Sequence, residues 1–454
     1  MWKWTANDAM TAVQRTFPVL FLALGLPMVI FFSLAVPPLQ VPDEENHLFR
    51  ADQISRGELM GTRRGGEIGG AVSAPLARFV DSIEASGKMA LEGGASSASD
   101  WTARTFESFP NTVQYGPAAY LPQALALALA RWSGSSALTA FYWARILNGL
   151  MALGLATIAL QIAQRGRLLF FCLLSMPMPL FLMASLSQDA LLIAGSALFL
   201  ALASRALSRS RPATAWTVAG MALLLVLIAC GRPPYIVLGV FFLLKPLRNP
   251  EWGTGRLHMG GLIALGVTSM LLLAWLGANQ GLQGGLRTDI SPKGQLCFLA
   301  GHLGTVPQIA VNSLRHRGLI LGMFGILGRL DLLLPLPFYP IALASMLAAY
   351  AEVGAAKFDD GLCGGERWLV AFALLLGGLL IHGILYLTWT PVGALGVEGV
   401  QGRYLIPLAL AAVFAIPNFS KIPASVLAGF YALSILTALI GAGCAIFAVL
   451  GQYA

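Results

Sequence analysis

The sequence predicts an all-α polytopic membrane protein, a bundle of about 11 transmembrane helices with a long loop after the first helix. Hydrophobic residues make up 57% of the 454 residues, charged residues only 11%, and the mean hydropathy is +0.73. Soluble domains carry roughly 25% charged residues. Apolar segments of about 20 residues, the length that crosses a bilayer, recur along the chain. Soluble, disordered and disulfide-rich secreted proteins are therefore excluded.

These apolar segments are the predicted spans. The first, Phe17–Val36, has no clear small-residue cleavage site before Pro37, so we expect an uncleaved span rather than a signal peptide. The others are 138–163, 168–187, 190–204, 213–231, 234–246, 259–278, 335–354, 368–390, 404–417 and 423–450.

Basic residues decide whether the short apolar segment 117–131 crosses the membrane. If this segment only lies on the membrane surface, all the loops that carry basic residues lie on the inner side with the N-terminus. The positive-inside rule favours this arrangement. Those connections contain Arg165 and Arg167, Arg205 to Arg211, Lys245 to Arg256, Lys357 and Arg367, and Lys421. The net charge of +8 is thus explained by orientation and does not indicate nucleic acid.

Five parts follow from this topology. They are 1–36, the inner N-terminus and first span; 37–137, an outer loop with interfacial helices; 138–278, transmembrane helices; 279–334, a second outer loop; and 335–454, C-terminal transmembrane helices with the outer loop 391–403. The five cysteines have no metal-ligand spacing, so no metal site is predicted from them.

An acidic motif begins the first outer loop. Pro42 followed by three acids indicates a helix start, and Asp43, His47 and Arg50 would share one face of that helix. A carboxylate, an imidazole and a guanidinium at the membrane surface can do acid–base chemistry. The alternative is a solvated, capped helix.

Three further charged positions lie beside apolar segments, where an ionisable group is costly. Asp189 is either a helix cap or a ligand-binding residue. Arg232 precedes two prolines and Tyr235, and Arg403 lies between Gln401-Gly402 and Tyr404. Each arginine either snorkels to lipid headgroups or binds a phosphate with paired hydrogen bonds.

Together these motifs resemble a known family, the bacterial membrane proteins catalogued as domain of unknown function 2142, which are grouped with the C-type glycosyltransferases (GT-C). The matching segments are Val41–Ala51 with Gly57, Gln114–Pro117 with Tyr120–Pro122, Ser175–Pro179 with Ser185, Ser187 and Asp189, Arg232–Tyr235, Gly328–Asp331 with Pro335, and Gln401–Tyr404 with Pro407. The family often has lysine at the position of Arg232, tryptophan at that of Arg329, and His-Pro-Pro in place of Gln114–Pro117.

The resemblance implies a GT-C-like bundle and an enzyme in the bacterial inner membrane whose active site faces the periplasm. Such an enzyme transfers a sugar from a polyprenyl-phosphate carrier to a glycan, lipid or protein acceptor, here in cell-envelope polysaccharide or glycolipid synthesis. Some C-type enzymes need a divalent cation and others do not, and the single Asp-Glu motif does not distinguish them.

Residue roles follow from the same resemblance. Asp43 is the expected general base, and Glu44 would hold acceptor or sugar hydroxyls. His47 and Arg50 would orient Asp43 or contact phosphate. Arg403, then Arg232, would bind the lipid phosphate, and Asp189 and Asp331 would lie at the outer rim of the cavity. Alternatives are a lipid or glycan transporter or flippase, which predicts repeated spans, a glycan polymerase or ligase, and a non-catalytic partner in glycan assembly.

Overall fold

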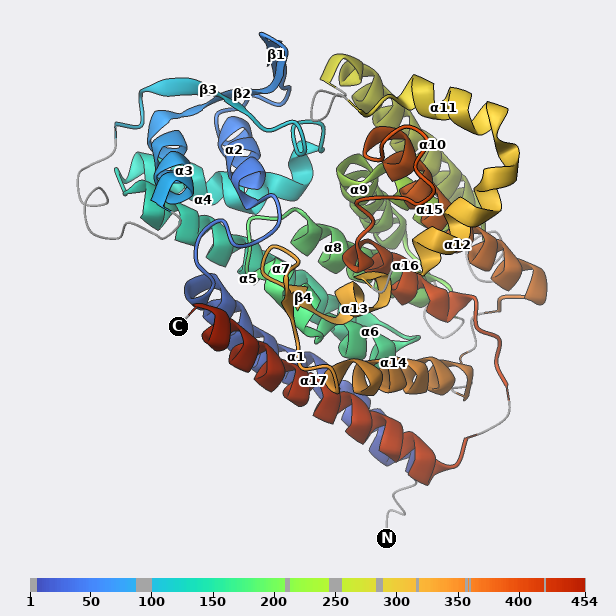
Figure 1. Ribbon diagram of the computed structural model, residues 1–454. Coiled ribbons are helices and arrows are strands. Elements are labelled where there is room, and N and C mark those ends of the chain that lie inside the picture. The colour runs from blue at the N-terminus through green and yellow to red at the C-terminus, as the bar shows by residue number, and fades with distance from the viewer. Residues whose placement is uncertain are drawn as a thin grey trace.

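The computed structural model describes residues 6–86, 100–208, 213–244, 255–282, 289–315, 318–355, 358, 361–419 and 422–453. Helices dominate these ranges, and a small sheet lies at one end of the bundle (Figure 1). Much of the predicted inner basic set, at 209–212, 245–254, 356–357 and 420–421, lies outside the described residues.

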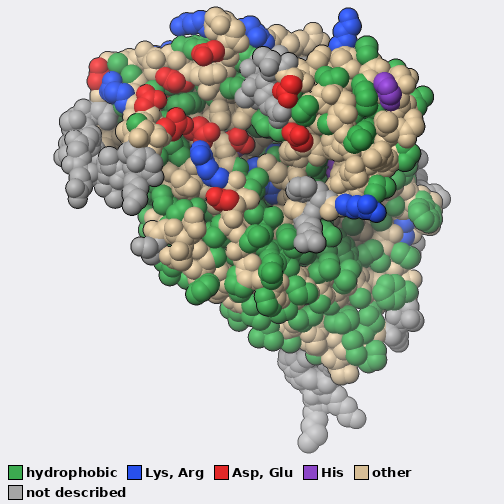
Figure 2. Space-filling model, viewed as in Figure 1, with side chains coloured by type: hydrophobic (Ala, Val, Ile, Leu, Met, Phe, Trp, Pro, Cys, Tyr) green, Lys and Arg blue, Asp and Glu red, His purple; other side chains and the backbone are tan. Residues whose placement is uncertain are grey.

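Among the described residues, seven helices are long and apolar enough to cross a membrane. They are α1 (Ala6–Ala35), α5 (Ala137–Ile162), α8 (Asp189–Ala206), α10 (Gly255–Ala278), α14 (Phe338–Ala355), α15 (Gly364–Thr388) and α17 (Ala424–Tyr453). Figure 2 shows hydrophobic side chains covering the lower part of one face, where α14 and α17 lie, whereas charged side chains gather in its upper part. The membrane class is thus confirmed, but the count of about 11 spans is not.

The difference in count comes from four predicted spans that are broken or short. The segment 168–187 contains two helices, α6 (Arg167–Leu174) and α7 (Pro177–Met183), because Met176 before Pro177 is extended. The other three segments contain the short helix α9 (Ala215–Gly231), the 3-10 helix η2 (Pro233–Leu243), and the succession η6 (Gly402–Leu405), α16 (Ile406–Ala411) and η7 (Ala412–Phe414). Proline lacks the N–H that a continuous helix needs, and it begins α7, η2 and the first turn of α16.

The first loop is a small folded unit with its own apolar core. Its elements are α2 (Glu44–Ser55), β1 (Thr62–Arg64), β2 (Glu67–Ser73), α3 (Ala74–Ser86), β3 (Arg104–Ser108), η1 (Pro117–Tyr120) and α4 (Leu121–Trp132). The strands form an antiparallel sheet in the order β1-β2-β3, with Arg63 opposite Ile68 and Ala71 opposite Phe106. Leu48 and Phe109 are buried in the core between this sheet and the helices.

Helix α4 corresponds to the segment of uncertain topology. Its 12 residues extend only about 18 Å, well short of a bilayer core. Leu121, Leu125 and Leu129 are exposed along one face, while Ala124 and Leu127 are buried on the other. Such a one-sided apolar pattern is typical of interfacial helices. The location of α4 on the membrane surface stays a prediction.

The second predicted loop is largely helical. Its described elements are η4 (Gln280–Leu282), α11 (Pro292–Gly301), η5 (Leu303–Thr305), α12 (Val306–Leu314), α13 (Gly318–Phe324) and the two short strands β4 (Ile326–Leu327) and β5 (Leu332–Leu333). Helix α13 packs against η6, the turn that carries Arg403.

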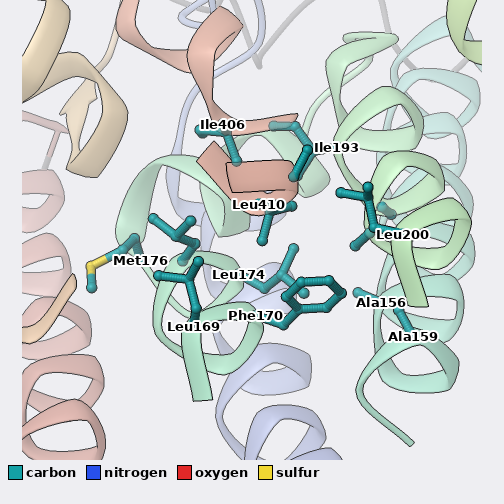
Figure 3. Packing of buried hydrophobic residues seen from close by; sticks show 14 of the residues in the cluster. Ala156, Ala159, Leu169, Phe170, Leu174, Met176, Ile193, Leu200, Ile406 and Leu410 are labelled. Carbon is teal, nitrogen blue, oxygen red and sulfur yellow. The ribbon is translucent and has the colours of Figure 1, made fainter. Parts of the chain in front are cut away.

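The apolar core fixes the C-terminal turn relative to the middle of the chain. Figure 3 shows Ile406 and Leu410 of α16 packed with Leu174 of α6 and with Ile193 and Leu200 of α8. All five side chains are buried. The start of α16 is therefore held beside the start of α8, where Asp189 lies.

Candidate functional site

Asp43 precedes α2 with its backbone in an unusual conformation. Its φ is 57°, in the left-handed region, and its side chain makes no cap hydrogen bond to the helix. Instead Asn111 Nδ2 donates to Asp43 Oδ1 at 2.9 Å. A left-handed non-glycine residue at a helix start is uncommon. The half-buried Asp43 carboxylate is therefore not the simple helix cap of the alternative interpretation.

Glu44 lies in a fully buried ion pair with Arg145 of α5. Arg145 Nε donates to Glu44 Oε1 at 2.8 Å, and Arg145 Nη2 donates to Oε2 at 2.6 Å. The same two oxygens accept from the backbone N–H groups of Leu186 and Leu39. Both Glu44 oxygens are thus occupied by protein donors, so the structure does not leave Glu44 as the predicted contact for substrate hydroxyls.

His47 is buried on α2 and shares a hydrogen bond between its Nδ1 and the hydroxyl of Tyr120, at 2.7 Å. Burial lowers the pKa of His47 from 6.5 to about 4, because the charged imidazolium loses its hydration. His47 is therefore neutral at pH 7, and it does not offer a positive charge to a phosphate.

Arg50 is fully buried and holds the loop together. Its Nη2 donates to the carbonyl oxygens of Leu59 and Tyr115 at 2.9 and 2.8 Å, and its Nη1 donates to Gln53. These bonds attach α2 to the turn before η1. Arg50 thus has a structural role, while its Nε is buried with no hydrogen-bond partner among the described residues, and its predicted contact with phosphate stays a prediction.

Asp189 is the centre of a second buried cluster. Arg232 Nη2 donates to Asp189 Oδ1 at 2.8 Å, and Arg403 Nε lies 3.0 Å from Asp189 Oδ2. The three side chains are 12% exposed or less. Residues from α8, from the end of α9 and from η6 therefore meet at one point, and two cations share one carboxylate.

Two tyrosines support these arginines. The guanidinium carbon of Arg232 lies 3.7 Å from the ring centroid of Tyr404, a close cation–π contact. The hydroxyl of Tyr235 donates to the Tyr404 carbonyl oxygen at 2.8 Å. Tyr235 and Tyr404, predicted from separate motifs, thus join the same cluster as Asp189.

Some buried polar atoms of the cluster lack a hydrogen-bond partner among the described residues. Within the described ranges, Arg232 Nε, Arg403 Nη1 and Gln401 Oε1 are buried and have no hydrogen-bond partner. Buried guanidinium N–H groups are rarely left unpaired in a folded protein, because the lost hydration is costly. These atoms are donors and acceptors available to a ligand.

Close backbone contacts hold both arginines in place. The Gly116 N–H donates to the Cys230 carbonyl oxygen at 2.9 Å, and a side chain at Gly116 would collide with Cys230. A side chain at Gly402 would collide with the backbone of α13, at Leu319 and Met323. Only glycine fits either contact, which explains the Gly116 and Gly402 of the sequence motifs.

The first loop and the Asp189 cluster lie close enough to interact. The charges of Asp43 and Asp189 raise the pKa of His47, and those of Arg403 and Arg232 lower it, although burial has the larger effect. Asp43, His47, Asp189, Arg232 and Arg403 therefore belong to one site.

Asp331 is not brought into this site. It is exposed in the turn between β4 and β5, with Gly328 against its carboxylate. The neighbouring Arg329 donates to the Leu39 carbonyl oxygen and lies 3.7 Å from Glu45. The predicted location of Asp331 at the rim is thus replaced by a place on the hairpin beside the start of the first loop.

Sequence reasoning missed Arg145 and Asn111, and it gave Tyr120 no role beyond its place in a family motif. Arg145 had a usable signal, since it is a lone charge within the predicted span 138–163. Asn111 and Tyr120 lie in polar or interfacial stretches and become visible only through their contacts with Asp43 and His47.

The two aspartates of the site differ in their partners. Both Asp189 oxygens face arginines, which leaves Asp43 as the one carboxylate of the site without a cationic partner in contact. Within the described parts of the chain, no three or more His, Cys, Asp or Glu side chains form a group that could hold a metal.

One comparison with known proteins identifies the chain. No curated protein matches it, and no solved structure does. A family model described as a predicted membrane protein matches residues 26–412, which include every residue of the site. The expected family is confirmed: the chain belongs to the predicted membrane protein family DUF2142.

Proposed function

We propose that this protein is a membrane glycosyltransferase of the GT-C type, which transfers a sugar from a polyprenyl-phosphate-linked donor to an acceptor hydroxyl. One observation carries the proposal. Arg232 and Arg403 present unpaired buried donors, and their charges act on the same histidine, His47, as the charge of Asp43, a carboxylate held by a single amide. Such a transfer needs donors that bind the phosphate and a nearby carboxylate that can accept a proton.

The proposed reaction is a single displacement. Asp43 accepts the proton of the acceptor hydroxyl while the oxygen of that hydroxyl forms a bond to the anomeric carbon. The bond from that carbon to the carrier phosphate breaks, and the electron pair leaves with the phosphate. Neutral His47, held by Tyr120, packs beside Asp43 without neutralising it. No metal enters this scheme.

Arg403 and Arg232 stabilise the departing phosphate. The carrier phosphate gains negative charge as the bond breaks, and Arg403 Nη1 and Arg232 Nε supply donors that already lack partners. Asp189 holds both guanidinium groups in position before substrate arrives. One such preorganised donor is worth about 3–4 kcal/mol in the transition state.

An apolar groove suits the carrier's hydrocarbon chain. Helices α4 and α5 border an open groove of about 200 Å³. It is lined by Ala126, Leu129, Trp143, Ile146, Leu147 and Leu150. Tyr120, which bonds to His47, directly precedes α4. A chain bound along α4 would therefore place its head group toward the site.

The test is transfer by purified protein in vesicles that contain radiolabelled undecaprenyl-phosphate sugars, assayed in turn against a pool of envelope glycans and glycolipids. We expect label to move to the acceptor with wild type. Asp43→Asn should reduce the rate by about 10²–10⁴-fold, the contribution of a positioned base. Asp331→Asn, which alters a carboxylate outside the site, is the matched control and should keep the rate.

Full transfer by Asp43→Asn would refute the base assignment. The same vesicles distinguish the transporter alternative, because they report whether the labelled lipid changes leaflet. Translocation without transfer, unchanged by Asp43→Asn, would favour a flippase and would refute the proposed enzyme.

A further inference from the structure

The turn Asn111–Gly116 connects the two halves of the site. The side-chain amide of its first residue donates to Asp43 Oδ1 at 2.9 Å. The backbone N–H of its last residue donates to the carbonyl oxygen of Cys230 at 2.9 Å, two residues before Arg232. The middle of the turn therefore lies between the carboxylate of Asp43 and the arginine cluster.

Two side chains from distant helices anchor the backbone of this turn. Trp275 Nε1 of α10 donates to the carbonyl oxygen of Gln114 at 2.8 Å. Arg50 Nη2 of α2 donates to the carbonyl oxygen of Tyr115 at 2.8 Å. The turn is thus held in position before a ligand binds, and a ligand is spared the cost of ordering it.

Tyr115 brings an unpaired hydroxyl to the middle of the turn. Its side chain is partly buried, and no described residue forms a hydrogen bond with its hydroxyl. Burial raises the pKa of Tyr115 above its ordinary 10, with smaller effects from the charges of Arg232, Asp189 and Asp43. The hydroxyl therefore keeps its proton at pH 7, and it can both donate and accept hydrogen bonds.

Asn111 adds an acceptor whose orientation is fixed. An ionised carboxylate only accepts hydrogen bonds, so the contact with Asp43 requires the Nδ2 of Asn111 on that side and leaves its Oδ1 on the other. This Oδ1 is buried and has no hydrogen-bond partner among the described residues. Only a group that donates, such as a hydroxyl, can pair with it.

The chemistry of these two groups fits a sugar better than a phosphate. In the proposed displacement, the anomeric carbon lies between the oxygen that Asp43 deprotonates and the phosphate that the arginines bind, so the sugar lies beside the turn. Sugar hydroxyls both donate and accept, as the hydroxyl of Tyr115 and the Oδ1 of Asn111 require. Phosphate oxygens are acceptors and do not pair with a second acceptor.

We infer that the turn Asn111–Gly116 is the sugar subsite of the donor, in which Tyr115 and Asn111 bind hydroxyl groups of the transferred sugar. The inference rests on the proposed glycosyltransferase function and adds residues that select the sugar. A site built to pair with substrate hydroxyls discriminates against a ligand that lacks them, because its polar groups are then left unpaired.

The test compares phosphodiesters of the same carrier lipid with and without a sugar. The undecaprenyl-phosphate esters of glucose, galactose and mannose are titrated separately into the purified full-length protein in detergent, and each dissociation constant is measured. Undecaprenyl methyl phosphate, which has the same charge and no sugar, is the control ligand. We expect at least one sugar ester to bind wild type about tenfold more tightly than the methyl ester.

Two variants should affect the sugar ester alone. Tyr115→Phe keeps the ring and removes the hydroxyl, so it should weaken binding of that sugar ester by roughly tenfold and leave the methyl ester unchanged. Asn111→Leu, which removes the acceptor, should have the same selectivity. Arg403→Gln should weaken both esters, because it removes a donor to the phosphate that they share. Tyr142→Phe changes another tyrosine packed against the same apolar core and is the matched control, expected to bind both esters like wild type.

The outcomes separate this inference from the function on which it rests. Equal binding of the methyl ester and every sugar ester to wild type, or unchanged sugar binding in Tyr115→Phe, would overturn the sugar subsite and leave the phosphate site in place. Equal loss of both esters in Tyr115→Phe would also overturn it, since Tyr115 would then be a structural residue. Binding of none of the esters to wild type would contradict the proposed function and the subsite together.

Discussion

Two buried ion networks in this protein use the same chemical groups in opposite ways. In the Glu44–Arg145 pair, two parallel hydrogen bonds and backbone partners occupy the carboxylate, and Arg145 also donates to the carbonyl oxygens of Ser33, Val36 and Pro37. In the Asp189 cluster, two arginines share one carboxylate and keep buried donors unpaired. Saturation indicates a structural role, and surplus donors indicate a ligand.

The largest effect on stability should follow loss of Arg145. Arg145→Ala leaves Glu44 buried without its cation, which typically costs about 3–5 kcal/mol in the free energy of unfolding. Denaturation of the purified variant in detergent measures this loss. The double variant Glu44→Gln with Arg145→Met, which removes both charges, should recover a large part of the stability. If Arg145→Ala were as stable as wild type, the Glu44–Arg145 pair would have no structural role and the contrast between the two networks would fail.

The dependence of the free energy of unfolding on pH should report that His47 is buried as a neutral imidazole. Its folded pKa of about 4 is below the ordinary 6.5, so the unfolded state binds this proton more readily. Neutral His47 therefore makes its full contribution to the free energy of unfolding above pH 6.5, and this contribution is lost as the pH falls toward 4. Between pH 7 and 5 it amounts to about 2 kcal/mol.

Thermal unfolding across that pH range measures the effect against a matched variant. His47→Asn removes the titrating group and keeps a side chain that can bond to Tyr120. Its stability should vary less with pH than that of wild type over the same range. Equal slopes for the two proteins would show that His47 is not buried as a neutral imidazole.

Loss of Arg403 should cost little stability. Arg403→Gln leaves Asp189 paired with Arg232, so we expect a change of about 1 kcal/mol in the free energy of unfolding, far less than for Arg145→Ala. The same denaturation experiment measures both. A loss as large as that of Arg145→Ala would make Arg403 a structural residue and the two networks equivalent.

Much of the fold was predictable from hydrophobic length and proline placement. The first span and the helices near 138–163 and 423–450 follow from apolar runs of bilayer length. The break at Pro233 was predicted, since separate spans were expected to end at 231 and to begin at 234. The break after Leu174 was not, since an apolar run has the same composition whether it is one helix or two. The sheet of the first loop was also missed, because its strands β1 and β3 are short, β1 is exposed, and the middle of β3 is only half-buried.

The site was predictable as a set of residues but not as a set of partners. Asp189, Arg232, Tyr235, Arg403 and Tyr404 come from separate motifs and meet in the structure. Spacing along α2 could not show that other protein groups occupy both carboxylate oxygens of Glu44 and both terminal nitrogens of Arg50. That distinction depends on Arg145 and on loop carbonyl oxygens far away in the sequence.

The most direct test of the central claim is binding of undecaprenyl phosphate to purified wild type and to Arg403→Gln. We expect saturable stabilisation of wild type, about 2.7 kcal/mol at 100 times Kd. We expect binding to be lost or weakened by at least tenfold in the variant while its fold is kept. Equal stabilisation of both proteins, or none of either, would contradict the assignment of the surplus donors to a carrier phosphate.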